Sequence, residues 1–143
     1  MKRWVVVGLV TAVGLGAALA DSDPIKQRRD LIKANGDATK PIVGMMKGAP
    51  FDLAAVKAAL KSYGEAAAKE PALFPDSSKT GDTNALPAIW ENKADFEARF
   101  KKLANDVDAA SAAIVDEASF KATMPGVLKN CGGCHEQYRA KKA

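Results

Sequence analysis

The sequence predicts an all-α protein that folds as an antiparallel four-helix bundle. Three observations support this prediction: apolar residues recur at helical spacing in four successive segments, no stretch alternates apolar and polar residues as a strand does, and breaks containing proline or glycine separate the segments. The chain has 143 residues, of which 48% are hydrophobic. This length is enough for one compact domain with its own core.

The first helix is expected to begin at Pro24, because proline suits the first helical position and Ser22 or Asp23 can cap the helix before it. Gly36 and Pro41 are expected to bend or interrupt this helix, and a Gly-Ala-Pro sequence ends it. Its apolar face consists of Ile25, Ile32, Ile42, Val43, Met45 and Met46.

The second helix is expected to follow Asp52, a candidate N-cap, and to stop at Pro71. Its apolar positions are Leu53, Val56, Leu60 and Tyr63. Residues 71–86 are rich in Pro, Ser, Thr, Gly and Asp, which predicts a long connection. Connections of this length in compact domains are often functional, so this one is expected to lie against a ligand.

The third helix is expected to begin at Pro87, and its apolar residues recur at alternating steps of four and three. They are Phe96, Phe100, Leu103, Val107, Ala110 and Ile114. Such a heptad-like seam is typical of helices that pack in a bundle.

The fourth helix is expected to run from about Asp116 or Ser119 to Lys141, with a kink at Pro125 and Gly126. One side of it carries Phe120, Met124, Val127, Leu128, Cys131, His135 and Tyr138. The apolar stripe continues past the expected kink, so the segment is predicted as one helix.

Residues 1–20 have the features of a cleaved secretory signal peptide: a basic start, an apolar middle and an Ala-Leu-Ala ending. The apolar run is short and contains glycines, which makes it a poor membrane span. Cleavage after Ala20 is expected to leave residues 21–143 as the mature domain, exported to the periplasm. Loss of Lys2 and Arg3 lowers the formal charge from +4 to +2, and so nearly balanced a domain is not expected to bind nucleic acid.

Residues 131–135 read Cys-Gly-Gly-Cys-His, and the Cys-x-x-Cys-His pattern is the attachment signature of c-type haem. On a helix, positions i, i+3 and i+4 share one face, so two thiols and one imidazole can meet a single flat macrocycle. The pattern therefore predicts one covalently bound haem c per chain, with Cys131 and Cys134 as attachment points and His135 as the axial iron ligand.

The two cysteines have three other interpretations. A thioredoxin-like redox pair requires a βαβ context that the sequence lacks, and a structural zinc site requires four ligands where this motif offers three. A Cys131–Cys134 disulfide in a haem-free helical interaction module is the third. The single histidine of the chain falls where the haem motif requires it, which favours haem.

With this motif near the C-terminal end of an exported helical chain, the sequence resembles the class II cytochromes c, and among them the cytochrome c′ family. The resemblance covers residues 22–142. It depends on the following residues: Arg28, Gly36, Lys47-Gly48, Leu73-Phe74-Pro75, Pro87-Ala88-Ile89-Trp90 and the block from Cys131 through Arg139. Of these, the C-terminal block is the specific one.

The resemblance implies roles for further residues around the haem. Arg28 corresponds to a partner of the haem propionates, and the next position, commonly glutamine in the family, is Arg29 here. Four residues after Arg28, Ile32 corresponds to the side chain that covers the distal side of the iron. Arg139, on the same helix face as His135, resembles the family's arginine near the proximal histidine. Further candidate contacts are Thr83, Asn84 and Trp90.

Because isoleucine offers no lone pair to iron, the resemblance implies a five-coordinate, high-spin haem that binds nitric oxide or carbon monoxide, or exchanges single electrons with redox partner proteins. It also implies a homodimer. No acid–base pair or nucleophile remains for catalysis, so the protein is not expected to be an enzyme. The alternative is a low-spin electron carrier of the cytochrome c-556 type, with a methionine as sixth ligand; the candidates are Met45, Met46 and Met124.

Overall fold

A computed structural model describes residues 23–141, and the predicted signal peptide lies outside this range. The described part of the chain contains, in order, α1 (Pro24–Met46), α2 (Leu53–Lys69), η1 (Glu70–Leu73), η2 (Asp76–Ser78), α3 (Ala88–Glu91), α4 (Lys93–Ala113) and α5 (Glu117–Tyr138). These elements are all helical, which confirms the predicted fold class. Within residues 23–141, no helix has the length and apolar character to cross a membrane.

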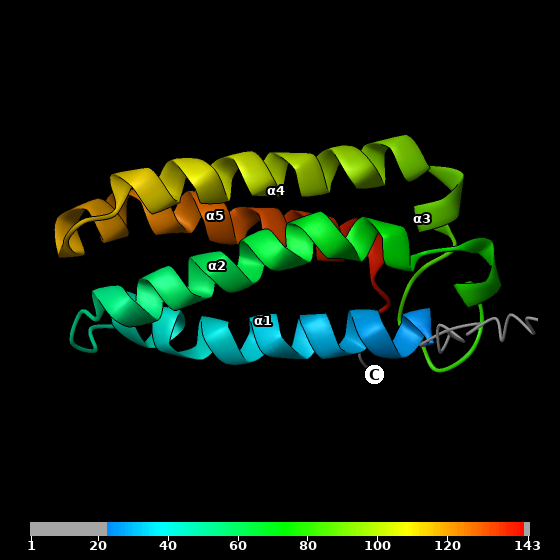
Figure 1. Cartoon of the computed structure of the whole chain (residues 1–143), viewed down its shortest axis with the longest axis horizontal. Coiled ribbons are helices and arrows are strands. Elements are labelled where there is room, and N and C mark those ends of the chain that lie inside the picture. The colour runs from blue at the N-terminus through cyan, green and yellow to red at the C-terminus, as the bar shows by residue number, and fades with distance from the viewer. Residues whose placement is uncertain (1–22, 142–143) are drawn as a thin grey trace, which may run out of the picture.

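The four long helices run alternately up and down (Figure 1). The α1–α2 and α4–α5 turns lie at one end of the bundle, whereas α3, the two η turns and the start of α1 lie at the other. Side-by-side packing follows the order α1, α2, α4, α5. Everything between α2 and α4 is therefore gathered at the end of the bundle where α5 also finishes.

Helix α1 begins as the sequence predicts, since the Asp23 side chain accepts a hydrogen bond of 2.9 Å from the backbone N–H of Ile25 and Pro24 occupies the first helical position. The helix passes through Gly36 and Pro41 without interruption. Proline removes only one helical donor, and the ion pairs of Asp37 with Lys33 and Lys40 span this stretch.

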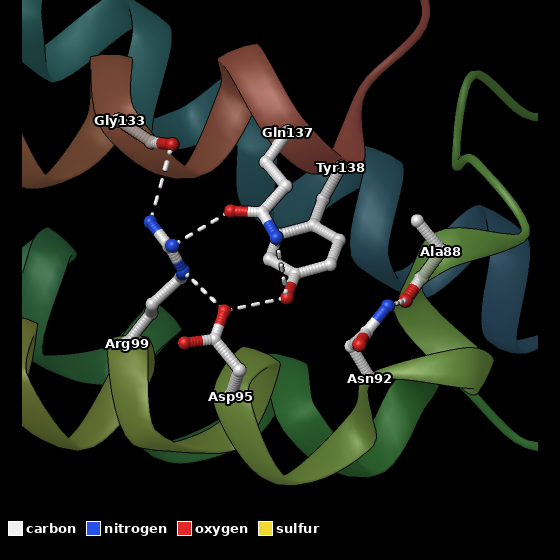
Figure 2. A network of polar contacts seen from close by, with 7 residues as sticks. All are labelled: Ala88, Asn92, Asp95, Arg99, Gly133, Gln137 and Tyr138. Carbon is white, nitrogen blue, oxygen red and sulfur yellow. Dashed lines mark hydrogen bonds and ion pairs between the residues drawn. The ribbon is translucent and has the colours of Figure 1, made fainter.

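The third predicted helix is two helices, so the prediction of one continuous helix from Pro87 is wrong. Asn92 separates α3 from α4 with φ −123° and ψ 45°. Its backbone N–H donates to the Ala88 carbonyl over 2.9 Å, and its side-chain amide donates to the same oxygen over 3.3 Å (Figure 2). Asparagine forms such local bonds readily, and here they turn the chain.

Helix α5 starts with a capping box between Asp116 and Ser119 and continues across Pro125. It ends at Tyr138, earlier than the predicted Lys141. The reason is a non-local pairing: Leu86 N–H donates to the Tyr138 carbonyl over 3.0 Å, and Ala140 N–H donates to the Asn84 carbonyl over 2.8 Å. Arg139 therefore lies in an extended tail and not on the helix face of His135, which corrects the prediction.

Two groups of buried side chains stabilise the bundle. The larger one fills the end with the short turns and consists of Ile42, Met45, Val56, Ala59, Leu60, Tyr63, Val107, Ala110, Ile114, Phe120, Met124 and Val127. The smaller one, at the other end, consists of Phe74, Ile89, Phe96 and Tyr138. Members of both groups line the cavity described next.

Candidate haem-binding site

A cavity of about 720 Å³ is lined by α1, α2, α4, α5 and the connection between α2 and α4. Its volume is typical of sites that bury a cofactor or a drug-sized ligand. Cys131, Cys134 and His135 all lie on its wall, as do most of the candidate residues from the sequence.

Helix α5 brings the two thiols and the imidazole to the cavity because they occupy positions i, i+3 and i+4 of one helix. Both cysteines are free and half-buried. Burial raises the pKa of Cys134 to about 11 and also raises that of Cys131, so both groups are neutral thiols at pH 7. A covalent thioether link to a macrocycle in the cavity needs such unpaired thiols.

The imidazole of His135 is also held neutral. Its burial lowers its pKa, and the positive charge of Arg139 lowers it further. Arg139 thus lies near the histidine despite being outside the helix. A neutral imidazole has a free nitrogen lone pair, which is the form that binds iron.

A polar network fixes the segment between the cysteines to α4 (Figure 2). Arg99 donates to the Gly133 carbonyl over 3.2 Å and to Gln137 Oε1 over 2.7 Å, and it pairs with Asp95 over 2.7 Å. Tyr138 completes the network by donating from its hydroxyl to Asp95 over 2.5 Å. Arg99 is a site residue not predicted from the sequence, and its i,i+4 spacing from Asp95 is the one sequence signal for this network.

Arg28 is almost fully buried, with 2% of its surface exposed. Its guanidinium donates four hydrogen bonds of 2.7–3.1 Å to the connection; the acceptors are Leu73 O, Ser78 Oγ, Ser78 O and Thr83 Oγ1. It also lies 4.5 Å from the centre of the Phe74 ring. The arginine thus holds residues 73–83 against α1 at the edge of the cavity, which a surface salt bridge would not do.

The remaining candidates divide into those on the cavity wall and one behind it. Ile32, Arg29, Thr83, Asn84 and Arg139 line the cavity, and Arg29 also forms an exposed ion pair with Asp82. The Ile32 side chain is 41% exposed, so it lies on the cavity wall without being buried in the core.

Trp90 is not on the wall. Its indole N–H donates to the Phe74 carbonyl over 3.0 Å and its ring packs edge-on against the Phe74 ring, which does line the cavity. Trp90 thus supports Phe74 from behind, and its expected contact with the haem stays a prediction.

None of the methionines in residues 23–141 lies on the cavity wall. Met124 is fully buried in the larger core group, and Met45 is buried there with its sulfur accepting a hydrogen bond of 3.1 Å from the Asp52 N–H. Met46 is 38% exposed on α1. The three methionines considered as iron ligands therefore occupy other sites.

Glu70 is a cavity residue that sequence analysis missed. It follows α2 directly and is 6% exposed, and its Oε1 atom has no hydrogen-bond partner. Burial raises the pKa of its carboxyl to about 7. No sequence pattern marks this burial, because a glutamate at a helix end before proline is usually solvated.

The donor set fits a covalently held haem. Two unpaired thiols and one neutral imidazole lie on the wall of a cavity large enough for a macrocycle, and apolar side chains such as Phe74, Phe96 and Leu128 line much of the remainder. Within residues 23–141, no group of three or more His, Cys, Asp or Glu side chains is arranged to hold a metal ion directly. An up-and-down helical bundle with this motif on its last helix defines a class II c-type cytochrome.

The chain belongs to the cytochrome c′ family, since the family model described as Cytochrome C' matches residues 23–139. Among curated proteins, a cytochrome c′ of Rhodopseudomonas palustris is 51% identical over 140 residues, covering 96% of this chain and 95% of that protein. A cytochrome c-556 of the same organism is 36% identical over 148 residues, covering 99% of both chains.

Solved structures show the same relationship. The chain matches cytochrome c′ from Rhodopseudomonas palustris with a TM-score of 0.82 and 52% identity, covering 85% of this chain and 99% of that one. It matches a structural model of oxidised cytochrome c556 from that organism with a TM-score of 0.76 and 38% identity, covering 85% and 98%. The family and the four-helix fold predicted from the sequence are confirmed.

Members of this family carry covalently attached haem c, which confirms the predicted cofactor. The chain is therefore a c-type cytochrome, a class of electron carriers. The coordination of the iron and the roles of individual residues remain predictions.

Proposed function

We propose that the protein is a periplasmic c-type cytochrome whose haem iron is five-coordinate and high-spin, and that it binds nitric oxide and carbon monoxide or exchanges single electrons with redox partner proteins. The observation that carries this proposal is that Ile32 faces the cavity that contains His135, whereas no methionine of residues 23–141 does. Isoleucine offers no electron pair to iron.

In this proposal Cys131 and Cys134 would hold the haem c through thioether bonds, and His135 would be the only protein ligand of the iron. Haem c supplies a one-electron couple and a coordination position for small gases. Ile32 makes the distal side apolar, which disfavours dioxygen because bound dioxygen gains from a hydrogen-bond donor. Nitric oxide and carbon monoxide do not need that donor, and the Ile32 side chain would have to move aside to admit them. Arg28 and Arg29 lie at the cavity edge, where the propionates need cationic partners.

The second candidate is a low-spin electron carrier of the cytochrome c-556 type, with a methionine sixth ligand. It is kept because curated proteins named cytochrome c-556 are also similar to the chain. It would require Met45, Met46 or Met124 to leave its present surroundings, and Met45 and Met124 are buried in the core.

The protein would act as a carrier or gas binder and not as an enzyme, because His135, its single histidine, is assigned to iron. We propose export through cleavage of residues 1–20. Met46, an apolar side chain 38% exposed on α1 and outside the cavity, supports the expected homodimer, because a second copy would cover it. Sedimentation of the mature protein tests the dimer.

The coordination is tested by the ferric absorption spectrum of the haem-loaded protein and of two variants. The parent and the control Ile32→Leu are expected to give high-spin spectra. Ile32→Met, which places a thioether at the same position, is expected to convert the spectrum toward low spin with a sulfur-to-iron band. A parent protein that already shows this band has a methionine ligand and contradicts the proposal.

A further inference from the structure

Glu70 is a buried acid on the cavity wall. It lies where α2 passes into η1, is 6% exposed, and its Oε1 atom has no hydrogen-bond partner. A buried carboxylate without a partner is costly, because it loses its hydration and gains nothing in return. The protonation state of this carboxyl group is therefore sensitive to the charge of the group that occupies the cavity.

The charged and titratable groups around Glu70 come from the elements that pack against η1, which are α1, α2 and α4, and from α5. On α1, Arg28 is bonded to the connection, Arg29 to Asp82 and Lys33 to Asp37. On α2 and α4, the Tyr63 hydroxyl is hydrogen-bonded to Thr39, and Arg99 pairs with Asp95. On α5, the cavity groups are Cys131, Cys134 and His135. The cations of α1 and α4 on the cavity wall thus have other acceptors.

The pKa effects place the carboxyl near the haem attachment points. The charge of Glu70 contributes to raising the pKa values of Cys131 and Cys134, so its field reaches the place where the macrocycle is joined to α5. It is not among the causes of the lowered pKa of His135.

We propose that Glu70 is a proton-binding site coupled to the oxidation state of the haem iron, an inference that depends on the proposed function because it requires haem in this cavity. When a donor redox protein passes one electron to the ferric iron, the Glu70 carboxylate takes up one proton from water. When the iron loses the electron to an acceptor protein, the same O–H bond breaks and the proton returns to water.

The coupling follows from charge. Reduction removes one positive charge from the haem, so the ferric state favours the carboxylate and the ferrous state favours the neutral acid. The interaction between the charge of the iron and the Glu70 carboxylate is strong because Glu70 is buried. By linkage, reduction raises the proton affinity of Glu70 by the same free energy by which protonation favours reduction. Because burial already raises the pKa of Glu70 to about 7, the proton exchange falls in the neutral range.

Spectroelectrochemical titration of the haem-loaded protein between about pH 5 and pH 9 tests this coupling. The midpoint potential of the parent protein is expected to fall as the pH rises through neutrality. A tenfold difference in proton affinity between the two oxidation states corresponds to a fall of about 59 mV. Glu70→Gln is expected to remove this fall, and the control Glu65→Gln, which changes an exposed glutamate of α2, is expected to keep it.

A pH dependence that persists unchanged in Glu70→Gln would belong to the propionates or to His135 and would overturn the proposal, as would a flat profile in the parent protein. If Glu70→Gln folds poorly, Glu70→Leu provides the same comparison with an apolar side chain of similar size. A ferric spectrum that changes with either substitution would identify Glu70 as an iron ligand and would also overturn the proposal. A colourless protein would contradict the proposed function itself, so the two failures are distinguishable.

Discussion

Replacing Arg28 with methionine removes the group that ties the connection between α2 and α3 to α1. The guanidinium donates four hydrogen bonds to residues 73–83, and both of those to Ser78 are buried. Each buried acceptor left without a donor costs about 1–3 kcal/mol, and water recovers part of this at the half-buried ones. Methionine has no charge, so the variant avoids the cost of burying the Arg28 guanidinium, the same burial that lowers the pKa of Arg28. This gain offsets part of the loss. We expect a net loss of about 3 kcal/mol, or about 12 °C in melting temperature.

Lys26→Met is the matched control, because this exposed cation of α1 forms an ion pair with Asp30 and does not line the cavity. Exposed pairs contribute less than about 1 kcal/mol. The assay is urea denaturation of both haem-loaded variants followed by circular dichroism, with equal dependence on urea required for comparison. If the two variants lose the same stability, or if Arg28→Met loses less than about 1 kcal/mol, Arg28 does not hold the connection and the reasoning is refuted.

Three further predictions concern the core and its titratable groups. Phe120→Ala should cost about 3–5 kcal/mol by thermal denaturation because Phe120 is fully buried, whereas Val115→Ala, at a side chain 67% exposed, should change stability little. The pKa of Glu70 rises from 4.5 in the unfolded chain to about 7 in the folded protein, so the parent protein should lose stability as the pH rises between these values. Glu70→Leu should remove up to roughly 3 kcal/mol of this loss. A pH profile of stability that is the same in Glu70→Leu and in the parent would contradict the prediction. Hydrogen bonds from Tyr138 and Arg99 lower the pKa of Asp95, so its contribution should disappear as the pH falls through that lowered pKa; acid denaturation of Tyr138→Phe should show a smaller loss over this range than the parent.

Local sequence signals predicted most of the fold correctly. The caps Asp23 and Asp52 accept backbone hydrogen bonds as expected, and the seam from Phe96 to Ile114 faces the core because its spacing matches the helical period. The Cys-x-x-Cys-His motif identified the cavity wall for the same reason, since residues three and four apart on one helix are neighbours.

The errors concern interactions between residues far apart in the sequence. Arg139 lies outside α5 because the tail pairs with residues 84–86. This contact joins residues more than fifty positions apart, and a helical sequence pattern cannot predict it. The contact of Arg28 with the haem propionates stays a prediction from resemblance, whereas its hydrogen bonds to a connection 45–55 residues away follow no local pattern. Glu70 is buried because η1, which contains it, packs against α1, α2 and α4. The residue type at such positions is known from the sequence, but its burial depends on contacts with distant parts of the chain.

The absorption spectrum of the ferrous, haem-loaded protein before and after addition of carbon monoxide tests the central claim most directly. With Ile32 covering the distal side and His135 as the only protein ligand, the account predicts that carbon monoxide binds without displacing any protein ligand. A ferrous spectrum that is already six-coordinate and resists carbon monoxide would contradict it.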